Sequence, residues 1–386
     1  MANGADPLAR HWTLDPDVLF LNHGSFGACP VPVLEAREAM YRKLERQPVA
    51  FLIQELPDRL DAAREALARF VHADPLDLSW VSNATSGVNT VLRSLTFQPG
   101  DELLTTDHAY NACRNALEYV AEKHGARAVV ATVPFPIESP DAVTEAVLAA
   151  VTPRTRLALI DHVTSPTGLV FPVAEIVREL RERGVDTLVD GAHAPGMLDL
   201  DVEALGAAYY TGNCHKWMCA PKGAGFLYVR RDLQPEIRPL VISHGANRPR
   251  PGRSRFHDEL DWTGTIDPTP FLCVPVAIET LASLVPGGWD EVRRRNRALA
   301  REGRRILSES LGTPPAPESM IATLVSFPLP DGPADPLHDR LLSDFRIEIP
   351  VFPWPAPPQR LIRISAQLYN SVEQYRALGQ ALRDLL

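Results

Sequence analysis

The sequence predicts an α/β fold built around a doubly wound, mostly parallel sheet. Segments with helical spacing of apolar residues alternate with short strand-like segments along much of the chain. Two nearly uninterrupted apolar runs, Leu157–Ile160 and Thr187–Val189, suit strands that are buried on both faces, as in a parallel sheet. Polar side chains follow several of the predicted strands, and the carboxyl ends of strands are where a doubly wound sheet carries its functional residues.

The expected elements follow one another as such a sheet requires. Apolar residues between Leu60 and Val71 recur at helical spacing, a short strand is expected at Ser79–Val81, and a second helix begins near Val88. Gly125 is a natural C-terminal cap for a third helix. Further strands are predicted at Asp101–Asp107, Ala128–Val133, Arg156–Asp161 and Gly223–Val229, and further helices at Asn111–Lys123, Asp141–Val151 and Val173–Arg183.

Length and composition limit the class of protein. A chain of 386 residues exceeds one ordinary core, so a large domain with a smaller one is expected. The net charge of −9 argues against a surface for nucleic acid or anionic membranes. The five cysteines form neither a disulfide framework nor a C-x-x-C metal spacing. Because a signal-peptide pattern and a bilayer-length apolar run are also absent, we expect a reduced, cytoplasmic enzyme without a metal.

The most informative feature is an ordered pair of charged residues. Lys216 lies in a short polar segment 26 residues after Asp190, which ends an apolar run. A lysine amine forms a Schiff base with the aldehyde of pyridoxal phosphate, and a carboxylate keeps the pyridine nitrogen protonated so that the ring accepts electrons. Each residue alone has an ordinary explanation, because an Asp after a strand is often a cap and most lysines are solvated. Together they predict a pyridoxal-phosphate site.

Polar residues after other predicted strands extend this site. The segment Ser82–Asn89 follows a strand and opens a helix, so its amides and hydroxyls suit a phosphate, although an ordinary N-cap is the simpler reading. After the next strand, the His108 imidazole suits stacking on a planar ring and the Tyr110 phenol suits proton transfer. The hydroxyl-rich segment 162–168, which includes Ser165, is expected to face the same cleft.

Two motifs carry a family resemblance. The segments 190–193 (Asp-Gly-Ala-His) and 210–217 (Tyr-Thr-Gly-Asn-Cys-His-Lys-Trp) resemble those of the class V aminotransferase family, in its isopenicillin N epimerase-like branch. The resemblance extends from Phe20–Gly27 to Arg363–Asn370. It implies the fold-type-I architecture of pyridoxal-phosphate enzymes, with a seven-stranded, mostly parallel sheet in a large domain and a smaller α+β C-terminal domain.

The resemblance also implies residue roles. Lys216 carries the Schiff base, Asp190 pairs with the pyridine nitrogen, His193 contacts the ring hydroxyl and His108 stacks on the ring. The remaining cofactor contacts fall mainly on the phosphate, and are assigned to Ala84, Thr85, Ser86, Ser165, Asn213 and His215. By the same resemblance, Arg363 clamps the substrate carboxylate, for which a guanidinium fork is suited, and Asn22 and His23 line the substrate site.

The family pattern implies an assembly as well. The stretch Trp262–Thr265 resembles one that reaches the phosphate of the other subunit, which implies a homodimer with shared active sites and gives Thr265 its role. The expected division of the chain is an N-terminal arm near the cleft (1–30), a large cofactor-binding domain (31–255) and a small C-terminal domain (256–386).

The reaction after removal of the α-proton is left open by these motifs. Lys216 is the expected base, and Tyr110 is the candidate acid for epimerisation or for protonation of a sulfur leaving group. The family branch favours an epimerase, a racemase or a C–S β-lyase over a true aminotransferase. A cysteine desulfurase is disfavoured because Phe345–Arg363 contains no Cys. A nucleotide-binding protein without pyridoxal phosphate is the alternative from another class, and it is weakened because no G-x-G-x-x-G follows a predicted strand.

Overall fold

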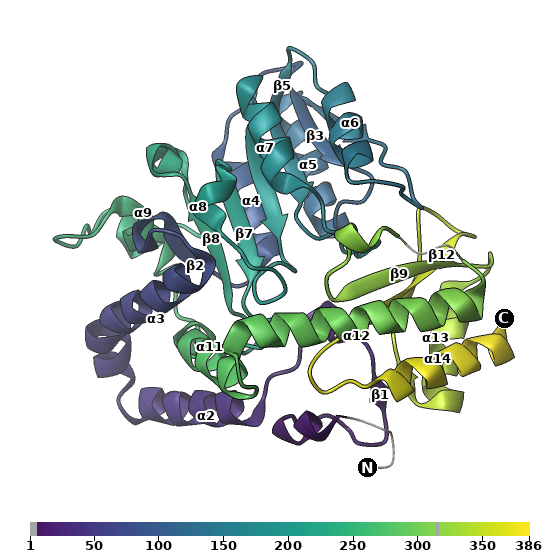
Figure 1. Ribbon diagram of the computed structural model, residues 1–386. Helices are drawn as coiled ribbons and strands as arrows, with labels where there is room; N and C mark the ends of the chain where they lie inside the picture. Colours follow the sequence, from purple (N-terminus) through teal and green to yellow (C-terminus); the bar gives the residue numbers. More distant parts are fainter. Residues whose placement is uncertain (1–5, 314–315) are drawn as a thin grey trace.

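The structure, a computed structural model, describes residues 6–313 and 316–386, and its centre is a seven-stranded sheet (Figure 1). The strands lie in the order β2-β8-β7-β6-β5-β3-β4. All neighbouring strands are parallel except at β8, which is antiparallel to both β2 and β7. The strands are β2 (Leu78–Val81), β3 (Glu102–Thr106), β4 (Arg127–Ala131), β5 (Thr155–Asp161), β6 (Asp186–Gly191), β7 (Tyr209–Asn213) and β8 (Gly225–Val229). The predicted fold class is confirmed.

Helices cover both faces of this sheet. In β5, Leu157 and Leu159 belong to the same core cluster as residues of α4 and α5, whereas Ala158 and Ile160 belong to another cluster that includes residues of α6 and α7. This alternation confirms that the strand is buried on both faces. The helices are α4 (Ala84–Ser94), α5 (Asn111–His124), α6 (Asp141–Ala149), α7 (Val173–Glu182), α8 (Val202–Leu205) and α9 (Arg255–Leu260).

One helix begins earlier than predicted. The expected start near Val88 is wrong, because α4 begins at Ala84. The Asn83 side chain caps the helix by accepting the Ser86 backbone N–H at 2.8 Å. Most of the predicted phosphate loop is therefore the first turns of a helix. At Gly125 the predicted C-terminal cap of α5 is confirmed, with the left-handed φ of 66° that glycine tolerates.

The C-terminal part forms a second, smaller sheet. Strands β9 (Leu324–Leu329), β12 (Arg360–Ser365) and β11 (Val351–Pro353) are antiparallel, in the order β11-β12-β9. The long helix α12 crosses Figure 1 below the large sheet and packs along α14. The helices of this part are α10 (Thr269–Leu272), α11 (Val274–Ser283), α12 (Gly288–Leu311), α13 (Ala334–Phe345) and α14 (Val372–Leu385).

The N-terminal arm joins the C-terminal part. Its strand β1 (Leu19–Phe20) pairs in parallel with β10 (Ile347–Glu348), and the short helix α1 (His23–Phe26) follows at once. Helices α2 (Val31–Arg46) and α3 (Leu56–Val71) then pack against α11. This path brings residues 21–28 close to the segment that carries Lys216.

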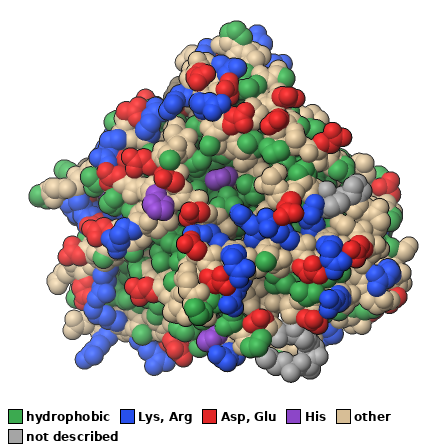
Figure 2. Space-filling model, in the orientation of Figure 1, with side chains coloured by type: hydrophobic (Ala, Val, Ile, Leu, Met, Phe, Trp, Pro, Cys, Tyr) green, Lys and Arg blue, Asp and Glu red, His purple; other side chains and the backbone are tan. Residues whose placement is uncertain are grey.

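The surface carries both signs of charge, and the cysteines lie in the core. Lys and Arg side chains are interspersed with Asp and Glu over the face shown in Figure 2. All five cysteines are buried and free. Over residues 6–313 and 316–386, no single helix is long and apolar enough to cross a membrane. Thr269–Ser283 and Gly288–Leu311 meet that test only when counted together, across a 70° bend.

Candidate active site

A cavity of about 220 Å³ lies at the carboxyl ends of the parallel strands. This is the predicted location, and residues from the N-terminal arm close one side of it. Most of the lining residues follow directly after β2, β3, β5, β6 and β7. They are Ser25, Phe26, Asn83, Ala84, Thr85, Tyr110, Asp161, Val163, Ser165, Asp190, Ala192, His193, Asn213, His215 and Lys216.

Asp190 lies one residue before the end of β6, with its side chain almost fully buried. Its exposure is 2%, and its carboxylate accepts the Ala192 N–H and the Cys113 S–H, each at 3.0 Å. Burial raises the pKa of this carboxyl, and no Lys or Arg among the described residues forms an ion pair with it. A buried carboxylate with this surrounding suits a cation bound in the cavity. The protonated pyridine nitrogen of the predicted cofactor is such a cation, so the site fits it.

Lys216 follows β7 and points at His193. The Lys216 Nζ lies 3.1 Å from His193 Nε2, and the Trp217 indole N–H is directed at His193 Nδ1 at 3.4 Å. Because an indole N–H only donates, Nδ1 accepts and the His193 proton lies on Nε2. The Lys216 amine can accept a hydrogen bond from Nε2 only in its neutral form. Burial lowers the pKa of Lys216 to about 8, and the nearby Arg363 charge acts in the same direction.

In the N-terminal arm, Ser25 and Phe26 line the cavity, whereas the predicted lining residues Asn22 and His23 do not, and His23 supports Lys216 from behind. His23 is fully buried, with its Nε2 3.1 Å from the Lys216 carbonyl oxygen and its Nδ1 2.8 Å from the Tyr369 hydroxyl. Asn22 donates to Glu348. At Gly27, with φ of 71°, an added Cβ would lie 2.2 Å from the His215 carbonyl oxygen. The predicted substrate-lining roles of Asn22 and His23 are therefore corrected, because this close backbone packing turns them away from the cavity.

The start of α4 forms the end of the cavity suited to phosphate. The Ala84 N–H donates to Asn213 Oδ1 at 2.8 Å, which joins the helix start to the end of β7. The positive end of the helix dipole at Ala84 and Thr85 suits an anion. His215 donates from Nδ1 to the Ala224 carbonyl at 2.8 Å, and burial lowers its pKa to about 4.

Ser86 does not line the cavity, contrary to the prediction. Its hydroxyl lies 2.8 Å from the Ser82 hydroxyl, and its backbone N–H is held by the Asn83 cap. The early start of α4 places Ser86 on the side of the helix that faces a separate hollow of about 270 Å³. The second hydroxyl expected for the phosphate is therefore not supplied by this residue.

His108 is likewise placed outside the cavity. Both ring nitrogens are occupied, Nδ1 with the Thr167 hydroxyl at 2.7 Å and Nε2 with the Val133 carbonyl at 3.0 Å. The ring packs against the aromatic ring of Trp354, with centroids 4.9 Å apart. Tyr110, two residues later, lines the cavity instead. The stacking role predicted for His108 is corrected, because its hydrogen bonds fix the ring in the core.

Arg363 lies behind two lining residues with its guanidinium buried. It donates to the Ser165 carbonyl oxygen, to the Ser165 hydroxyl at 3.2 Å and to the Ser25 hydroxyl at 3.4 Å. Its Nε has no hydrogen-bond partner among the described residues, and burial lowers the pKa of the guanidinium to about 10. A surface ion pair is thereby ruled out for this side chain. A buried donor of this kind suits a carboxylate that enters the cavity.

The sequence reading missed Asp161 as a site residue. Asp161 ends β5 and pairs in register with Asp190 on β6, so the two carboxyl groups are neighbours. Its Oδ2 accepts the Tyr110 N–H at 3.3 Å, while its Oδ1 has no hydrogen-bond partner among the described residues. Burial, with the Asp190 charge as the next contribution, raises the pKa of Asp161 well above its usual range. The available signal was its position at the end of a predicted buried strand.

Comparisons with known proteins identify the family of the chain. The family described as "Aminotransferase class-V" matches residues 21–342. The chain is 38% identical to an isopenicillin N epimerase of Streptomyces clavuligerus over 96% of both chains. It is 32% identical to a probable chloroplastic L-cysteine desulfhydrase of Arabidopsis thaliana, over 96% of this chain and 84% of that protein.

Solved structures show the same fold. A complex of the cystine C–S lyase C-DES with cysteine persulfide superposes with a TM-score of 0.82 at 26% identity, and covers 96% of this chain and 98% of that one. A C-DES variant with glycine covalently linked to its PLP cofactor gives a TM-score of 0.81 at 25% identity, and covers 97% and 99%.

Proposed function

The chain belongs to the class V aminotransferase family and is a pyridoxal-phosphate enzyme that acts on amino acids, and from this premise we propose that it is an amino-acid epimerase or racemase. In this proposal the α-proton leaves one face of the α-carbon and returns on the other. The similarity to isopenicillin N epimerases over nearly the whole chain supports this choice.

The single observation that carries the proposal is the strand order around Asp190. Lys216 follows β7 and Tyr110 follows β3, and these strands lie on opposite sides of the β6–β5 pair. Both side chains line the same cavity. A proton-accepting amine and a proton-donating phenol therefore approach the bound substrate from two sides, as a change of configuration requires. Tyr110 is 43% exposed, which allows its proton to exchange with solvent.

Each buried group has a defined task in this scheme. The bound cofactor supplies an electron-withdrawing ring that acidifies the α-proton of the substrate. Asp190 holds the proton on the ring nitrogen, and Arg363 orients the substrate carboxylate. Lys216, whose pKa burial lowers to about 8, takes the α-proton in its neutral form. Tyr110 delivers a proton to the opposite face.

A C–S β-lyase is the second candidate, because several relatives at 30–32% identity are named as L-cysteine desulfhydrases. The same residues would serve it, with Tyr110 protonating the sulfur that leaves. The cysteine desulfurase alternative is weaker, since β11 and the following segment up to Arg363 contain no cysteine to receive sulfur.

Isotope exchange distinguishes these reactions. We expect the holoenzyme in deuterated water to exchange the α-proton of its amino-acid substrate and to accumulate the opposite configuration, without pyruvate, ammonia or sulfide. NMR follows the exchange and chiral chromatography follows the configuration. Stoichiometric pyruvate and sulfide without inversion would establish the lyase instead. A protein that cannot be reconstituted with pyridoxal phosphate would contradict both.

The role of Tyr110 gives a sharper test. Tyr110→Phe is expected to lower net inversion by about 10²-fold or more while Lys216 still exchanges the proton on its own face. Tyr119→Phe is the matched control, because Tyr119 is also an exposed tyrosine, lies on α5, which begins directly after Tyr110, and does not line the cavity. Unchanged inversion in Tyr110→Phe would assign the second acid to another group.

We also propose that the enzyme is a homodimer with shared sites. Thr265 is exposed and does not line the cavity of its own chain. Ile266, the next residue in the chain, is an exposed apolar side chain, and it lines the hollow of about 270 Å³ together with Leu240 and Val241. These three side chains are between 45% and 57% exposed. Phe26, at the mouth of the cavity, is 74% exposed. Large exposed apolar residues of this kind suit contact with a second copy.

Mixed dimers test this assembly. Lys216→Ala and Thr265→Val are each expected to be impaired alone, and a heterodimer of the two should regain up to about half of the wild-type activity, because one of its two sites has neither defect. Activity of purified heterodimers is the measurement, and subunits carrying both changes, paired with each other, are the control. No recovery in confirmed heterodimers would indicate self-contained subunits.

A further inference from the structure

The segment Trp262–Ile266 is a loop that ion pairs hold at both ends. Asp261 directly precedes it and pairs with Arg64 and Arg253. Asp267 directly follows it and pairs with Arg37 at 3.0 Å. Between these ends, Gly264 has a φ of 127° and no neighbour within 4 Å of an added Cβ, and Thr265 is exposed. The loop therefore extends from two fixed points.

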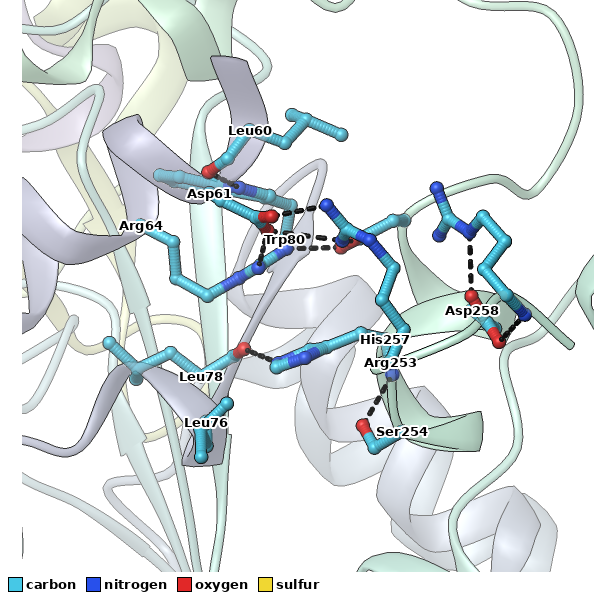
Figure 3. Close-up of polar contacts among 12 residues, drawn as sticks. Leu60, Asp61, Arg64, Leu76, Leu78, Trp80, Arg253, Ser254, His257 and Asp258 are labelled. Atoms are coloured by element: carbon cyan, nitrogen blue, oxygen red, sulfur yellow. Dashed lines mark hydrogen bonds and ion pairs between the residues drawn. The ribbon is translucent and has the colours of Figure 1, made fainter. Parts of the chain in front are cut away.

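The first anchor is a ring of alternating charges. Arg64 donates to Asp61 at 2.6 Å and to Asp261 at 2.5 Å, and Arg253 bridges the same two aspartates. Figure 3 shows Arg64 and Arg253 directed at Asp61. We call these four residues the ion-pair ring. It joins α3, which carries Asp61 and Arg64, to the C-terminal end of α9.

Burial makes the two anchors unequal. The Arg64 and Asp261 side chains are 4% and 2% exposed, whereas Arg37 and Asp267 are 41% and 29% exposed. A buried pair depends strongly on both partners, since removal of one leaves an uncompensated charge. An exposed pair is screened by water and salt and contributes little. Arg64 is therefore the main determinant of where the loop starts.

The ring is also connected to the wall of the site in its own chain. His257 on α9 donates from Nε2 to the Leu78 carbonyl on β2 at 2.9 Å (Figure 3). Strand β2 leads directly into Asn83, the cap of α4. Helix α9 therefore contacts both segments: it leads into the loop that carries Thr265, and it is hydrogen-bonded to the strand that precedes the phosphate end of the cavity.

We propose that Arg64 is a positioning residue that fixes the Trp262–Ile266 loop for the cofactor site of the partner subunit. This inference rests on the homodimer with shared sites proposed above. Arg64 donates to Asp61 and Asp261 and is not one of the residues that line the cavity, so in this proposal it acts through Asp261 and the loop.

Replacement of Arg64 should weaken cofactor binding. Arg64→Met is expected to raise the cofactor dissociation constant by about tenfold or more, because the loop loses its fixed start. Arg64→Lys should give a smaller rise, since one ammonium cannot bridge two aspartates as the guanidinium fork does. Arg37→Ala, at the exposed anchor, should change the constant by less than about twofold. Equilibrium titration of apoenzyme with pyridoxal phosphate is the measurement.

Glu102→Gln is the matched control for loss of stability. Glu102 is a fully buried carboxylate that pairs with Arg127 and Arg154, but it lies at the amino end of β3, away from the cavity. We expect Glu102→Gln to lower the melting temperature as a broken buried pair does, with the cofactor dissociation constant unchanged. An equal loss of cofactor in Glu102→Gln would overturn the proposal, because general destabilisation would then explain both.

Mixed dimers separate positioning from destabilisation. In one dimer, Lys216→Ala is on one subunit and Arg64→Met on the other, so the intact Lys216 site receives an undisturbed loop and should release cofactor at the wild-type rate. In the second dimer, both changes are on one subunit and the other is wild type, so the intact site receives the displaced loop and should release cofactor about tenfold faster.

The two dimers contain the same substitutions, so a general loss of stability cannot make release faster in the second dimer alone. Equal release rates, or faster release in the first dimer, would overturn the proposal and leave the homodimer intact. A wild-type protein that is monomeric with bound cofactor would remove the shared site and the proposed role of Arg64 together, while the epimerase proposal would stand.

Discussion

Asp190→Asn is expected to retain the bound cofactor while turnover falls by about 10²- to 10³-fold, the usual effect of losing one pre-positioned electrostatic group. Asn keeps the shape of the side chain, and its amide can still accept the Ala192 N–H. It cannot hold the proton on the ring nitrogen, so the acidity that the α-proton gains from the ring is lost. Steady-state turnover and the absorption spectrum of the holoenzyme are the two measurements.

Asp161→Asn is the matched control for this variant. Asp161 is the in-register neighbour of Asp190, and burial together with the Asp190 charge raises the pKa of Asp161, which favours its neutral form. A neutral amide in place of a neutral acid should leave turnover within about threefold of the wild type. If Asp190→Asn kept near-normal turnover, or if Asp161→Asn were the more damaging change, the assignment of the two carboxyl groups would be wrong.

Arg363→Ala is expected to keep the cofactor and its colour but to weaken substrate binding by about 2–5 kcal/mol, because the substrate carboxylate is left buried without its partner. Arg363→Lys should recover only part of this loss, since a point charge cannot reproduce the fork of the guanidinium. Spectral titration of each variant with the amino-acid substrate measures the change directly.

Two comparisons separate carboxylate binding from support of the neighbouring loop, where Arg363 also holds Ser165. An amine that lacks the carboxylate should bind Arg363→Ala and wild type alike. Arg360→Ala is the matched control, because Arg360 is buried on the same strand but donates to the Pro330 and Pro333 carbonyls instead of facing the cavity residues. Equal weakening of the amine and the amino acid would mean that the carboxylate is held elsewhere.

The principal chemistry of the site could be predicted from the sequence because it depends on residue type and order along the chain. A carboxylate at the end of a buried strand and a lysine after the next one are placed together by any parallel sheet with this topology, so Asp190 and Lys216 needed no coordinates. The α/β class followed in the same way from periodicity, which reports the burial of each face directly.

Which side chains beyond the strand ends reach the cavity could be determined only from the tertiary structure. His108 and Tyr110 are two residues apart after β3, yet contacts from Thr167 and Val133 keep the first in the core while the second reaches the cavity. His23 is directed to Lys216 by packing between segments far apart in the chain. Periodicity carries no information about such contacts, because they depend on loop paths.

The sequence by itself therefore determined the fold class, the cofactor chemistry and the pair Asp190 and Lys216, all of which are set by local pattern and strand order. Only the tertiary structure decided which neighbours face the cavity, that Asp161 is a second buried carboxyl beside Asp190, and that Arg363 is buried without an ion pair among the described residues. The physical reason is that burial and partner choice depend on groups brought together from distant parts of the chain, and these fix protonation and side-chain direction.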